Sequence, residues 1–543
     1  MKTTVGDYLL MRLKELGIDD VFGVPGDYNL GFLDQVVHYK GLRWIGNCNE
    51  LNGAYAADGY ARIKGAAALV TTYGVGELSA INGIAGSFAE YLPVVKIVGM
   101  PSAEIQKSDI VFHHSIRTNE YNVFEEMYAK VTKAQTILTV ENAAEEIDRV
   151  LTVCFKKKLP VYIGVSSDIC YQEIEVEKKP LELTNSVSAK ETMEEAAIRI
   201  TKVLSHSKRP LLCVDLCAMR HDIKKDIEHL IKEVQIPFIT TNMGKAYINE
   251  SNPLFVGVYS GENGNEKVYD FVHKADCIIS FGALISDLNT SMLPKSSSIE
   301  IHSNHVRVKN SHYYELYFHD FIPFLSKKIK DSKLKFSATK IPKKEKNHFM
   351  IEKNFNKIEQ AYFWDRMGYF FKEHSTIIAG TGTSLFGLLP IRMPDNVNFI
   401  SQIIWASIGY SVGALLGTSI ADSSKENILF VGDGAFQLTA QEVSTMLRYE
   451  TTPIIFLLNN DGYTIERVIH GEKMEYNDIQ MWNYADLPKM FGENVWTTKV
   501  TTTEELETCL SELRANDDKL RFVEVIMERM DVPEMLMKMF RKE

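Results

Sequence analysis

The stretch that decides the fold is NILFVGDGAFQLTAQEVSTMLRYETTPIIFLLNNDGYTIE, residues 427–466. Its apolar run Ile428–Val431 predicts a buried parallel strand, and Pro453–Leu458 predicts a second one. Both strands of such a unit end at the same edge of the sheet. We therefore expect Asp433, after the first strand, and Asn460, after the second, to lie close together.

A helix is expected between these two strands. Thr439 and Glu442 have the spacing of a capping box, in which each side chain satisfies a free backbone N–H of the first turn. This pattern predicts a helix that begins here and continues through Met446 and Leu447.

The residues at the two strand ends have the chemistry of a cation and phosphate site. One carboxylate, one amide oxygen and a tight glycine turn with a free carbonyl suit Mg²⁺ or Ca²⁺, which keep other positions for phosphate oxygens and water. Gly432 and Gly434 let the backbone approach a diphosphate, and the following helix presents N–H groups to it. The alternative is an ordinary turn that contains an aspartate, followed by an unrelated asparagine pair.

Length and composition indicate a large enzyme without a membrane or nucleic-acid surface. A chain of 543 residues is too long for one core, so about three domains are expected. No apolar run reaches the roughly 18 residues of a membrane span, and the amphipathic start has no signal-peptide pattern. A net charge of −11 argues against nucleic acid. Seven scattered cysteines fit a reducing cytoplasm.

Short apolar runs alternate with helical patterns along the whole chain, which indicates doubly wound α/β domains. The first unit ends near Asp168, and the charged stretch Glu173–Ala189 is interpreted as a linker. A second α/β unit follows. The lysine-rich stretch Lys327–Lys346 is interpreted as another solvated linker. A third α/β unit begins near Phe355 and carries the Asp433 loop.

The first unit contributes polar residues whose interpretation is open when each is taken alone. Glu50 follows an apolar strand and opens a helix, where an exposed first-turn glutamate is common. Asp27 follows another strand, where it could be a helix cap. The pair His113-His114 has the pattern of surface residues, because no cysteine or acid stands at ligand spacing nearby.

Several stretches together resemble the thiamine-diphosphate-dependent 2-oxo-acid decarboxylases, the family of pyruvate, indolepyruvate and branched-chain keto-acid decarboxylases. The matching stretches are FGVPGDYNL around Asp27, NELNGAYAADGYAR from Asn49, TTYGVGELSAINGIAGSFAE from Thr71, the His113-His114 pair, GTGTS from Gly380, WASIGY from Trp405, the Asp433 loop, and GYTIERVIHG from Gly462. The histidine pair with the downstream Thr464-Ile465-Glu466 is specific to the decarboxylase branch.

The resemblance implies three doubly wound α/β domains: a pyrimidine-binding domain over residues 1–180, a central domain over 190–340 and a diphosphate-binding domain over 355–543. It implies thiamine diphosphate and Mg²⁺ as cofactors, with the ion held by Asp433, Asn460 and Gly462. The residues that match cofactor-binding positions are Glu50, Thr383, Ala406, Ile408, Asp433, Gly434, Ala435, Asn460, Gly462, Tyr463 and Ile465.

The same resemblance assigns chemical roles to some of these positions. Glu50 is expected to hydrogen-bond the pyrimidine N1′, which helps the cofactor to lose its C2 proton. Ile408 is expected to hold the cofactor folded, and the carbonyl of Ala406 to accept from its 4′-amino group. Ordinary core packing is the alternative for Ile408. The catalytic set for the later proton transfers is Asp27, His113, His114 and Glu466, and no single proton donor can be assigned within it.

The positions that match the substrate pocket are Leu288, Thr381, Leu385, Phe386, Ile465, Ile469 and Met539. Thr381 and Ile465 resemble the pyruvate-preferring members, whereas Leu288 replaces a common aromatic residue and would widen one wall. A methylene changes discrimination by only about 1–3 kcal/mol. We therefore expect a graded preference for small to medium aliphatic 2-oxo acids. Met535, Leu536, Met539 and Phe540 form either a lid or plain core.

Two other functions are considered. A carboligase of the acetolactate-synthase type shares the fold and cofactor but lacks the double histidine. A non-catalytic structural relative is expected to have lost Glu50 or the metal aspartate. The resemblance further implies a homo-oligomer, at least a dimer and by extension a dimer of dimers. In it the first domain of one subunit faces the third domain of another, with the cofactor between them.

Overall fold

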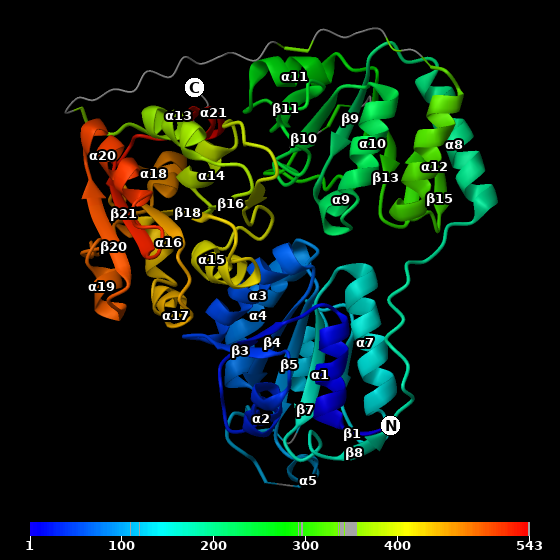
Figure 1. Cartoon of the computed structure of the whole chain (residues 1–543), viewed down its shortest axis with the longest axis vertical. Coiled ribbons are helices and arrows are strands. Elements are labelled where there is room, and N and C mark those ends of the chain that lie inside the picture. Colours follow the sequence, from blue (N-terminus) through cyan, green and yellow to red (C-terminus); the bar gives the residue numbers. More distant parts are fainter. Residues whose placement is uncertain are drawn as a thin grey trace.

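The computed structural model describes residues 1–108, 110–118, 120–290, 293–294, 297–334, 336, 341–342 and 356–540 of the chain. Figure 1 shows three bodies, with the first at the bottom, the central one at the upper right and the third at the upper left. Each contains one mostly or wholly parallel sheet with helices packed on it, so the expected three-domain α/β fold is confirmed. Within these ranges no helix has the length and apolarity needed to cross a membrane.

The first domain is built on six parallel strands in the order β3-β2-β4-β5-β7-β6. The strands are β2 (Asp20–Gly23), β3 (Arg43–Gly46), β4 (Ala67–Thr72), β5 (Val94–Met100), β6 (Gln135–Ile137) and β7 (Val161–Ser166). The helices are α1 (Val5–Glu15), α2 (Leu30–His38), α3 (Glu50–Lys64), α4 (Val75–Ala89), α5 (Ala103–Gln106), α6 (Val123–Tyr128) and α7 (Ala143–Lys157).

The third domain repeats this arrangement, with six parallel strands in the order β17-β16-β18-β19-β21-β20. The strands are β16 (Thr376–Ala379), β17 (Asn398–Ile400), β18 (Asn427–Gly432), β19 (Ile454–Asn459), β20 (Val495–Val500) and β21 (Leu520–Ile526). The helices are α13 (Gln360–Phe370), α14 (Thr383–Leu388), α15 (Tyr410–Ala421), α16 (Asp433–Gln437), α17 (Glu442–Arg448), α18 (Thr464–His470), the 3₁₀ turn η1 (Glu475–Asn477), α19 (Leu487–Phe491), α20 (Thr503–Leu513) and α21 (Glu534–Phe540). Strand for strand, the two sheets have the same connectivity.

The central domain has seven strands in the order β11-β10-β9-β12-β13-β14-β15, of which the last three pair in antiparallel fashion. The strands are β9 (Pro210–Val214), β10 (Phe238–Thr241), β11 (Phe255–Tyr259), β12 (Cys277–Phe281), β13 (Ser297–Ile301), β14 (His305–Val308) and β15 (Ser311–Tyr314). The helices are α8 (Lys190–Leu204), α9 (Leu216–Arg220), α10 (Lys224–Val234), α11 (Glu266–His273) and α12 (Phe318–Asp331).

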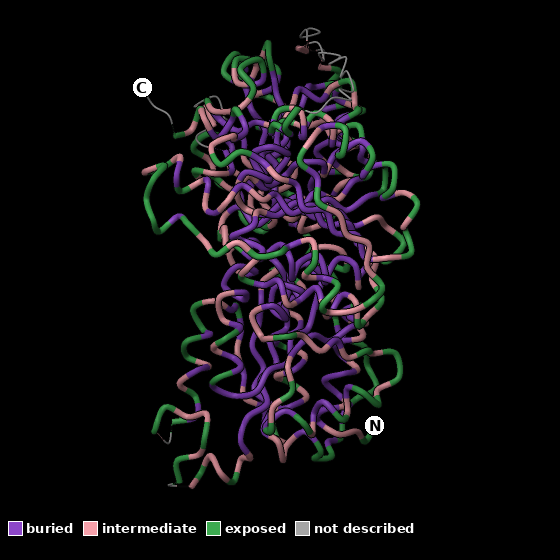
Figure 2. Tube along the Cα trace, turned by 90° about the vertical axis from the view of Figure 1, so that its left-hand side faces the viewer, coloured by how far each residue is buried: buried purple, intermediate pink, exposed green. Residues whose placement is uncertain are grey.

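The first and third domains share one apolar core. Helix α3 packs on α15, and the glycines of α15 permit the close approach. A Cβ on Gly417 would lie 1.9 Å from the carbonyl oxygen of Ala56, and one on Gly413 would lie 2.6 Å from the Cβ of Tyr55. Buried chain runs continuously through the interior of the molecule in Figure 2, while exposed chain lies at its periphery.

Both predicted linkers contain regular structure at one end. Residues Glu173–Glu175 form β8, which pairs antiparallel with β1 (Lys2–Thr4) and ties the start of the chain to the end of the first domain. The lysine-rich stretch begins inside α12, because the apolar spacing of Leu325 and Ile329 carries the helix on to Asp331. Most of the remainder of that stretch lies outside the described residues.

The predicted capping box is wrong. Helix α17 begins at Glu442, but its cap is Gln441, without a side-chain bond, and Thr439 Oγ1 donates to the carbonyl of Gly409 instead. The buried carboxylate of Glu442 accepts from Asn47 Nδ2 and from Asn52 Nδ2, both at 2.8 Å. The local pattern assigned the Glu442 side chain to the end of its own helix. In the structure this side chain contacts the first domain instead.

Candidate active site

The carboxyl edge of the third sheet holds the predicted cation loop. The chain passes from β16 to β17 on one side and returns to β18 on the other, so the strand order reverses between β16 and β18. Ligands of open α/β sheets bind beside such a reversal. Gly382 follows β16 and Asp433 follows β18, which places both loops at this point.

Asp433 lies at the centre of this loop and is buried. Its Oδ2 accepts from Gly462 N at 2.9 Å and its Oδ1 from Gly434 N at 2.7 Å. Burial raises the pKa of Asp433 to about 6, although the N–H groups of Gly462, Gly434 and Asn460 lower it. The β18 and β19 ends therefore converge as expected, and we call residues 432–435 with 459–463 the metal loop.

The backbone of the metal loop requires glycine at Gly462. Its φ is +111°, in the region that favours glycine, and a Cβ there would lie 2.4 Å from the carbonyl oxygen of Asn477. The neighbouring Asp461 also has a positive φ, and its carboxylate pairs with Arg529 ahead of α21. The ring of Tyr463 covers Gly434, where a Cβ would approach it to 2.5 Å. These contacts hold the loop in one shape.

The residues present fit a divalent cation with a diphosphate. The buried carboxylate of Asp433 faces backbone N–H groups, and Asn460 beside it is buried. A buried carboxylate is costly unless paired, hydrogen-bonded or bound to a metal. A Cβ on Gly432 would meet nothing within 4 Å, so the backbone beside Asp433 is open to a large polyanion. The donor set is oxygen only, which suits Mg²⁺.

The first sheet places its polar residues at the equivalent reversal, between β2 and β4. Asp27 follows β2, and Gly74 follows β4. Glu50 begins α3, as predicted, and Asn49 caps that helix through its side chain. The carboxylate of Glu50 lies against Gly76 of α4, where a Cβ would be 3.1 Å from Oε1.

Asp27 and the two histidines form what we call the Asp27–His113–His114 cluster. His113 Nε2 lies 2.5 Å from Asp27 Oδ2, and His114 Nε2 lies 3.7 Å from Asp27 Oδ1. Asp27 is not a helix cap, since α2 is capped at Asn29. The sequence around the histidines showed no metal-site pattern, because the fold supplies the facing acid from a distant loop.

A buried charged group behind Glu50 was not identified from the sequence. Lys96 is fully buried in β5 and donates to Thr71 Oγ1 at 2.5 Å. Burial lowers the pKa of Lys96, and the negative charges of Glu77 and Glu50 oppose that shift. The available signal was a lysine inside the apolar run LPVVKIVGM.

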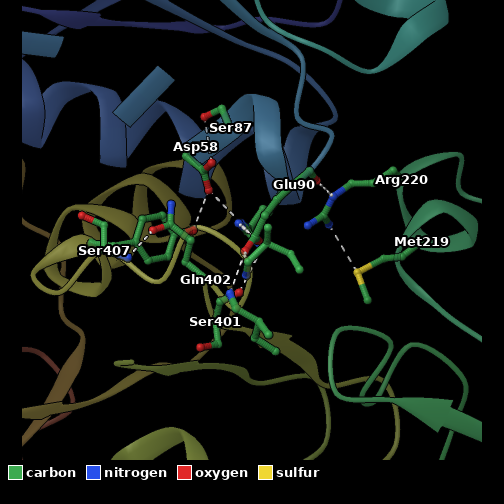
Figure 3. Close-up of polar contacts among 12 residues, drawn as sticks. Asp58, Ser87, Glu90, Met219, Arg220, Ser401, Gln402 and Ser407 are labelled. Carbon is green, nitrogen blue, oxygen red and sulfur yellow. Dashed lines mark hydrogen bonds and ion pairs between the residues drawn. The ribbon is translucent and has the colours of Figure 1, made fainter. Parts of the chain in front are cut away.

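The loop that carries Ala406 and Ile408 is held by a buried junction of all three domains, drawn in Figure 3. Glu90 Oε1 accepts from Ile403 N at 2.6 Å and from Ile404 N at 2.9 Å. Its Oε2 accepts from Arg62 Nη2 at 2.7 Å, and its carbonyl accepts from Arg220 Nε of the central domain at 2.9 Å. The junction fixes the loop from behind.

Within that loop, Ala406 has a φ of +52°, an uncommon conformation for a residue with a Cβ. Ile408 is 40% exposed, so it is not the ordinary core residue of the alternative interpretation. The side chain of Gln402 accepts from Ser407 N at 3.0 Å and closes the turn between them. Backbone strain of this kind is maintained only when the surroundings determine it.

The predicted pocket residues divide into buried and exposed groups. Leu385 and Phe386 are buried, and Leu288, Ile465 and Met539 pack on the same apolar cluster. Thr381 donates to the carbonyl of Gln402 at 3.2 Å, and Thr383 is buried at the start of α14. Ile469 and Glu466 are exposed on α18. Met535 and Leu536 of α21 are buried in this cluster, whereas Phe540 is exposed.

Known proteins match this chain in sequence over nearly its whole length, and three family models match within it. Three family models match: the thiamine pyrophosphate enzyme N-terminal TPP-binding domain over residues 3–125, the central domain over 198–320 and the C-terminal TPP-binding domain over 380–525. A putative pyruvate decarboxylase of Schizosaccharomyces pombe is 41% identical, with 98% of this chain and 97% of the relative covered. Pyruvate decarboxylase isozyme 1 of Saccharomyces cerevisiae is 38% identical over the same shares. The pyruvate decarboxylase of Candida albicans is 39% identical over 98% and 96%.

Proposed function

The chain belongs to the thiamine-diphosphate-dependent 2-oxo-acid decarboxylases, and on that premise we propose that it converts a small or medium aliphatic 2-oxo acid to an aldehyde and CO₂. The observation that carries the proposal is the Asp27–His113–His114 cluster at the strand reversal of the first sheet. Decarboxylation must end with protonation of carbon, and this cluster supplies acids and bases that solvent and substrate can reach.

Thiamine diphosphate and Mg²⁺ are the cofactors of this proposal. Asp433, Asn460 and the carbonyl of Gly462 would hold the ion, and Gly434 and Ala435 would face the diphosphate at the start of α16. When bound, thiamine diphosphate supplies a nucleophilic carbon and an acceptor for the electrons that CO₂ leaves behind. Thr383, Tyr463 and Ile465 would line the same loop edge.

The chain's own residues would hold the cofactor folded and move its protons. Ile408 would keep the two rings in contact, and the strained carbonyl of Ala406 would accept from the amino group. Glu50 would hold or release a proton at the pyrimidine ring, with the buried Lys96 behind it. His114, Asp27 and Glu466 would serve the later proton transfers, with His113 supporting them.

The pocket supports a preference for small to medium chains. Leu385 and Phe386 are buried and would form its apolar floor, and Leu288 and Ile465 pack on the same cluster. Thr381 is held to the Gln402 carbonyl, so its methyl group rather than its hydroxyl is free for substrate. Initial rates with a panel of 2-oxo acids of increasing length test this order.

Product analysis with pyruvate tests the reaction itself. Acetaldehyde with an equal amount of CO₂ supports the decarboxylase. Acetolactate as the main product would instead make the chain a carboligase. Failure to turn over any acid of the panel, with cofactor bound, would make it a non-catalytic relative.

The proposal also includes assembly as a homodimer or a dimer of dimers. It further includes a cytoplasmic location and domain limits at residues 1–180, 190–340 and 355–543. Apolar side chains beside the two strand reversals are exposed in the single chain, among them Val75, Trp405, Ile408 and Leu438. Such a group is typical of a surface that another subunit covers. The seven cysteines are all unpaired, as a reducing compartment requires.

Subunit exchange tests whether each site is shared. Glu50→Gln and Asp433→Ala subunits are each expected to be inactive, but a mixed dimer would carry both lesions in one site and leave the other intact. Activity should then partly return on mixing. If native mass spectrometry verifies exchange and activity stays at zero, the shared-site arrangement is wrong.

A further inference from the structure

The two histidines and the aspartate of the Asp27–His113–His114 cluster have the composition of a transition-metal site. Each oxygen of Asp27 faces a different imidazole, Oδ2 toward His113 Nε2 at 2.5 Å and Oδ1 toward His114 Nε2 at 3.7 Å. One ligand atom from each residue can be chosen so that all three lie within 4.8 Å of one another. Zn²⁺ holds such atoms at about 2.0–2.2 Å, so modest side-chain rotations bring all three onto one ion.

Adjacent side chains usually point to different sides of a chain, yet both rings here face one carboxylate. The reason is the φ of +67° at His114, an uncommon conformation for a residue with a Cβ. Gly74 makes room for it, because a Cβ there would lie 2.1 Å from the His114 carbonyl oxygen. The ring of Tyr28 stacks on His113 with centroids 5.0 Å apart. Three segments of the first domain therefore bring the three ligand residues together before any ion arrives.

Exposure makes the cluster open to ions. In the single chain the side chains of Asp27, His113 and His114 are 49%, 57% and 30% exposed, so an ion can reach all three without unfolding of the first domain. Three protein ligands also leave a fourth position for water or a substrate carboxylate, the pattern of open zinc sites. In contrast, the metal loop offers oxygen atoms alone and suits Mg²⁺.

We propose that the Asp27–His113–His114 cluster binds one Zn²⁺ or Cu²⁺ ion per chain and that the bound ion blocks the acid–base chemistry of the site. Imidazole nitrogen favours Zn²⁺ and Cu²⁺ over Mg²⁺, so the two sites select different ions from a mixture. The blocking step rests on the proposed function, since it removes the imidazole nitrogens and the carboxylate from proton transfer. Zinc binding itself does not depend on turnover.

The first experiment measures zinc binding to the holoenzyme, with thiamine diphosphate and millimolar Mg²⁺ present, by competition with a chromophoric chelator. One Zn²⁺ per chain is expected, and His113→Gln, His114→Gln and Asp27→Asn should each weaken binding about tenfold or more. The matched control is His302→Gln with His305→Gln, a stacked histidine pair of the central domain, which should bind zinc as the wild type does. Equal zinc affinity in the cluster variants would overturn the site.

Two further measurements separate the parts of the proposal. Co²⁺ in place of Zn²⁺ should give visible absorption bands that disappear in His114→Gln, and bands that persist there would overturn the assignment even if a variant folds poorly. Zn²⁺ should inhibit the wild type over the concentrations that fill the site, with recovery on adding EDTA. Relief by excess Mg²⁺ would locate the zinc at the metal loop instead. Full occupancy without inhibition would overturn the blocking step, whereas a chain that decarboxylates nothing yet binds zinc would defeat the proposed function alone.

Discussion

The metal loop and the Asp27–His113–His114 cluster lie at the corresponding strand reversals of two sheets of identical connectivity, yet they are built in opposite ways. Asp433 is buried and accepts from backbone N–H groups, whereas Asp27 is half exposed and, within the described part of the chain, pairs with the side chains of two histidines from another loop. A cation site gains from fixed backbone donors and exclusion of water. A proton-transfer site needs groups that can turn toward substrate. On the proposed function, the duplicated sheet would therefore serve cofactor binding in one copy and proton transfer in the other.

The largest effect on cofactor binding is expected from the buried member of this pair. Asp433→Ala should weaken thiamine diphosphate binding about a hundredfold or more in the presence of Mg²⁺, because it removes one of few protein oxygens available to the ion. Calorimetric titration measures this change. Asp486→Ala, an exposed acid of the same domain, serves as the control and should bind normally. Wild-type affinity in Asp433→Ala would show that the loop does not hold the ion.

Glu50→Gln tests whether the first sheet contributes to turnover without contributing to cofactor affinity. Glutamine keeps the shape and one hydrogen-bonding oxygen but cannot exchange a proton, so cofactor affinity should stay within about threefold while turnover falls about a thousandfold. Hydrogen–deuterium exchange at C2 of the bound cofactor reports the step directly. Exchange as fast as in the wild type would give Glu50 another role.

The contact between the first and third domains should contribute to the stability of the fold rather than to catalysis. Glu442→Ala leaves the half-buried amide of Asn47 and the buried amide of Asn52 without their acceptor across the domain junction. A loss of about 3 kcal/mol in the free energy of unfolding is expected. Urea denaturation followed by circular dichroism measures it, with the exposed Glu472→Ala as the control. Equal midpoints for both variants would contradict the importance of the junction.

Three glycines with positive φ allow the two regions to be compared, because alanine introduces backbone strain at each of them. Gly462→Ala would press on the Asn477 carbonyl in the metal loop and should lower cofactor affinity about tenfold. Gly74→Ala would press on the His114 carbonyl and should lower turnover about tenfold with cofactor affinity unchanged. Gly65→Ala meets nothing within 4 Å and should show only the backbone strain. The comparison fails if Gly74→Ala and Gly462→Ala lose the same property.

The contrast between the two regions also explains what could be predicted from the sequence. The strands and the Asp433–Asn460 pair could be predicted because each signal is local: an apolar run, a glycine turn and a polar residue after it. The cluster of Asp27 with His113 could be grouped only through the family resemblance and not from local pattern, because its members are 86 residues apart and meet only when two loops fold together.

Local rules also failed where tertiary contacts compete for the same side chain. Glu442 has the spacing of a capping box, but a junction with two amides outweighs one helix-end bond. The lysines of α12 indicated a linker, although Leu325 and Ile329 continue the apolar face of the helix beneath them. In both cases burial decided the structure and polar pattern did not.

An effect on substrate selectivity alone is expected at the pocket wall, where neither the metal loop nor the Asp27–His113–His114 cluster is altered. Leu288 packs on the apolar cluster that contains Leu385 and Phe386, and its carbonyl accepts from Asn242 Nδ2 at 2.7 Å, which fixes the backbone. Leu288→Phe should therefore narrow the wall without moving the loop. The ratio of kcat/KM for pyruvate over a branched-chain 2-oxo acid should rise about tenfold, which is the discrimination expected from one or two methylene groups. Leu288→Met, of similar volume, is the control and should leave that ratio within about twofold. If Leu288→Phe lowers both rates equally, the side chain supports the fold and does not select the substrate.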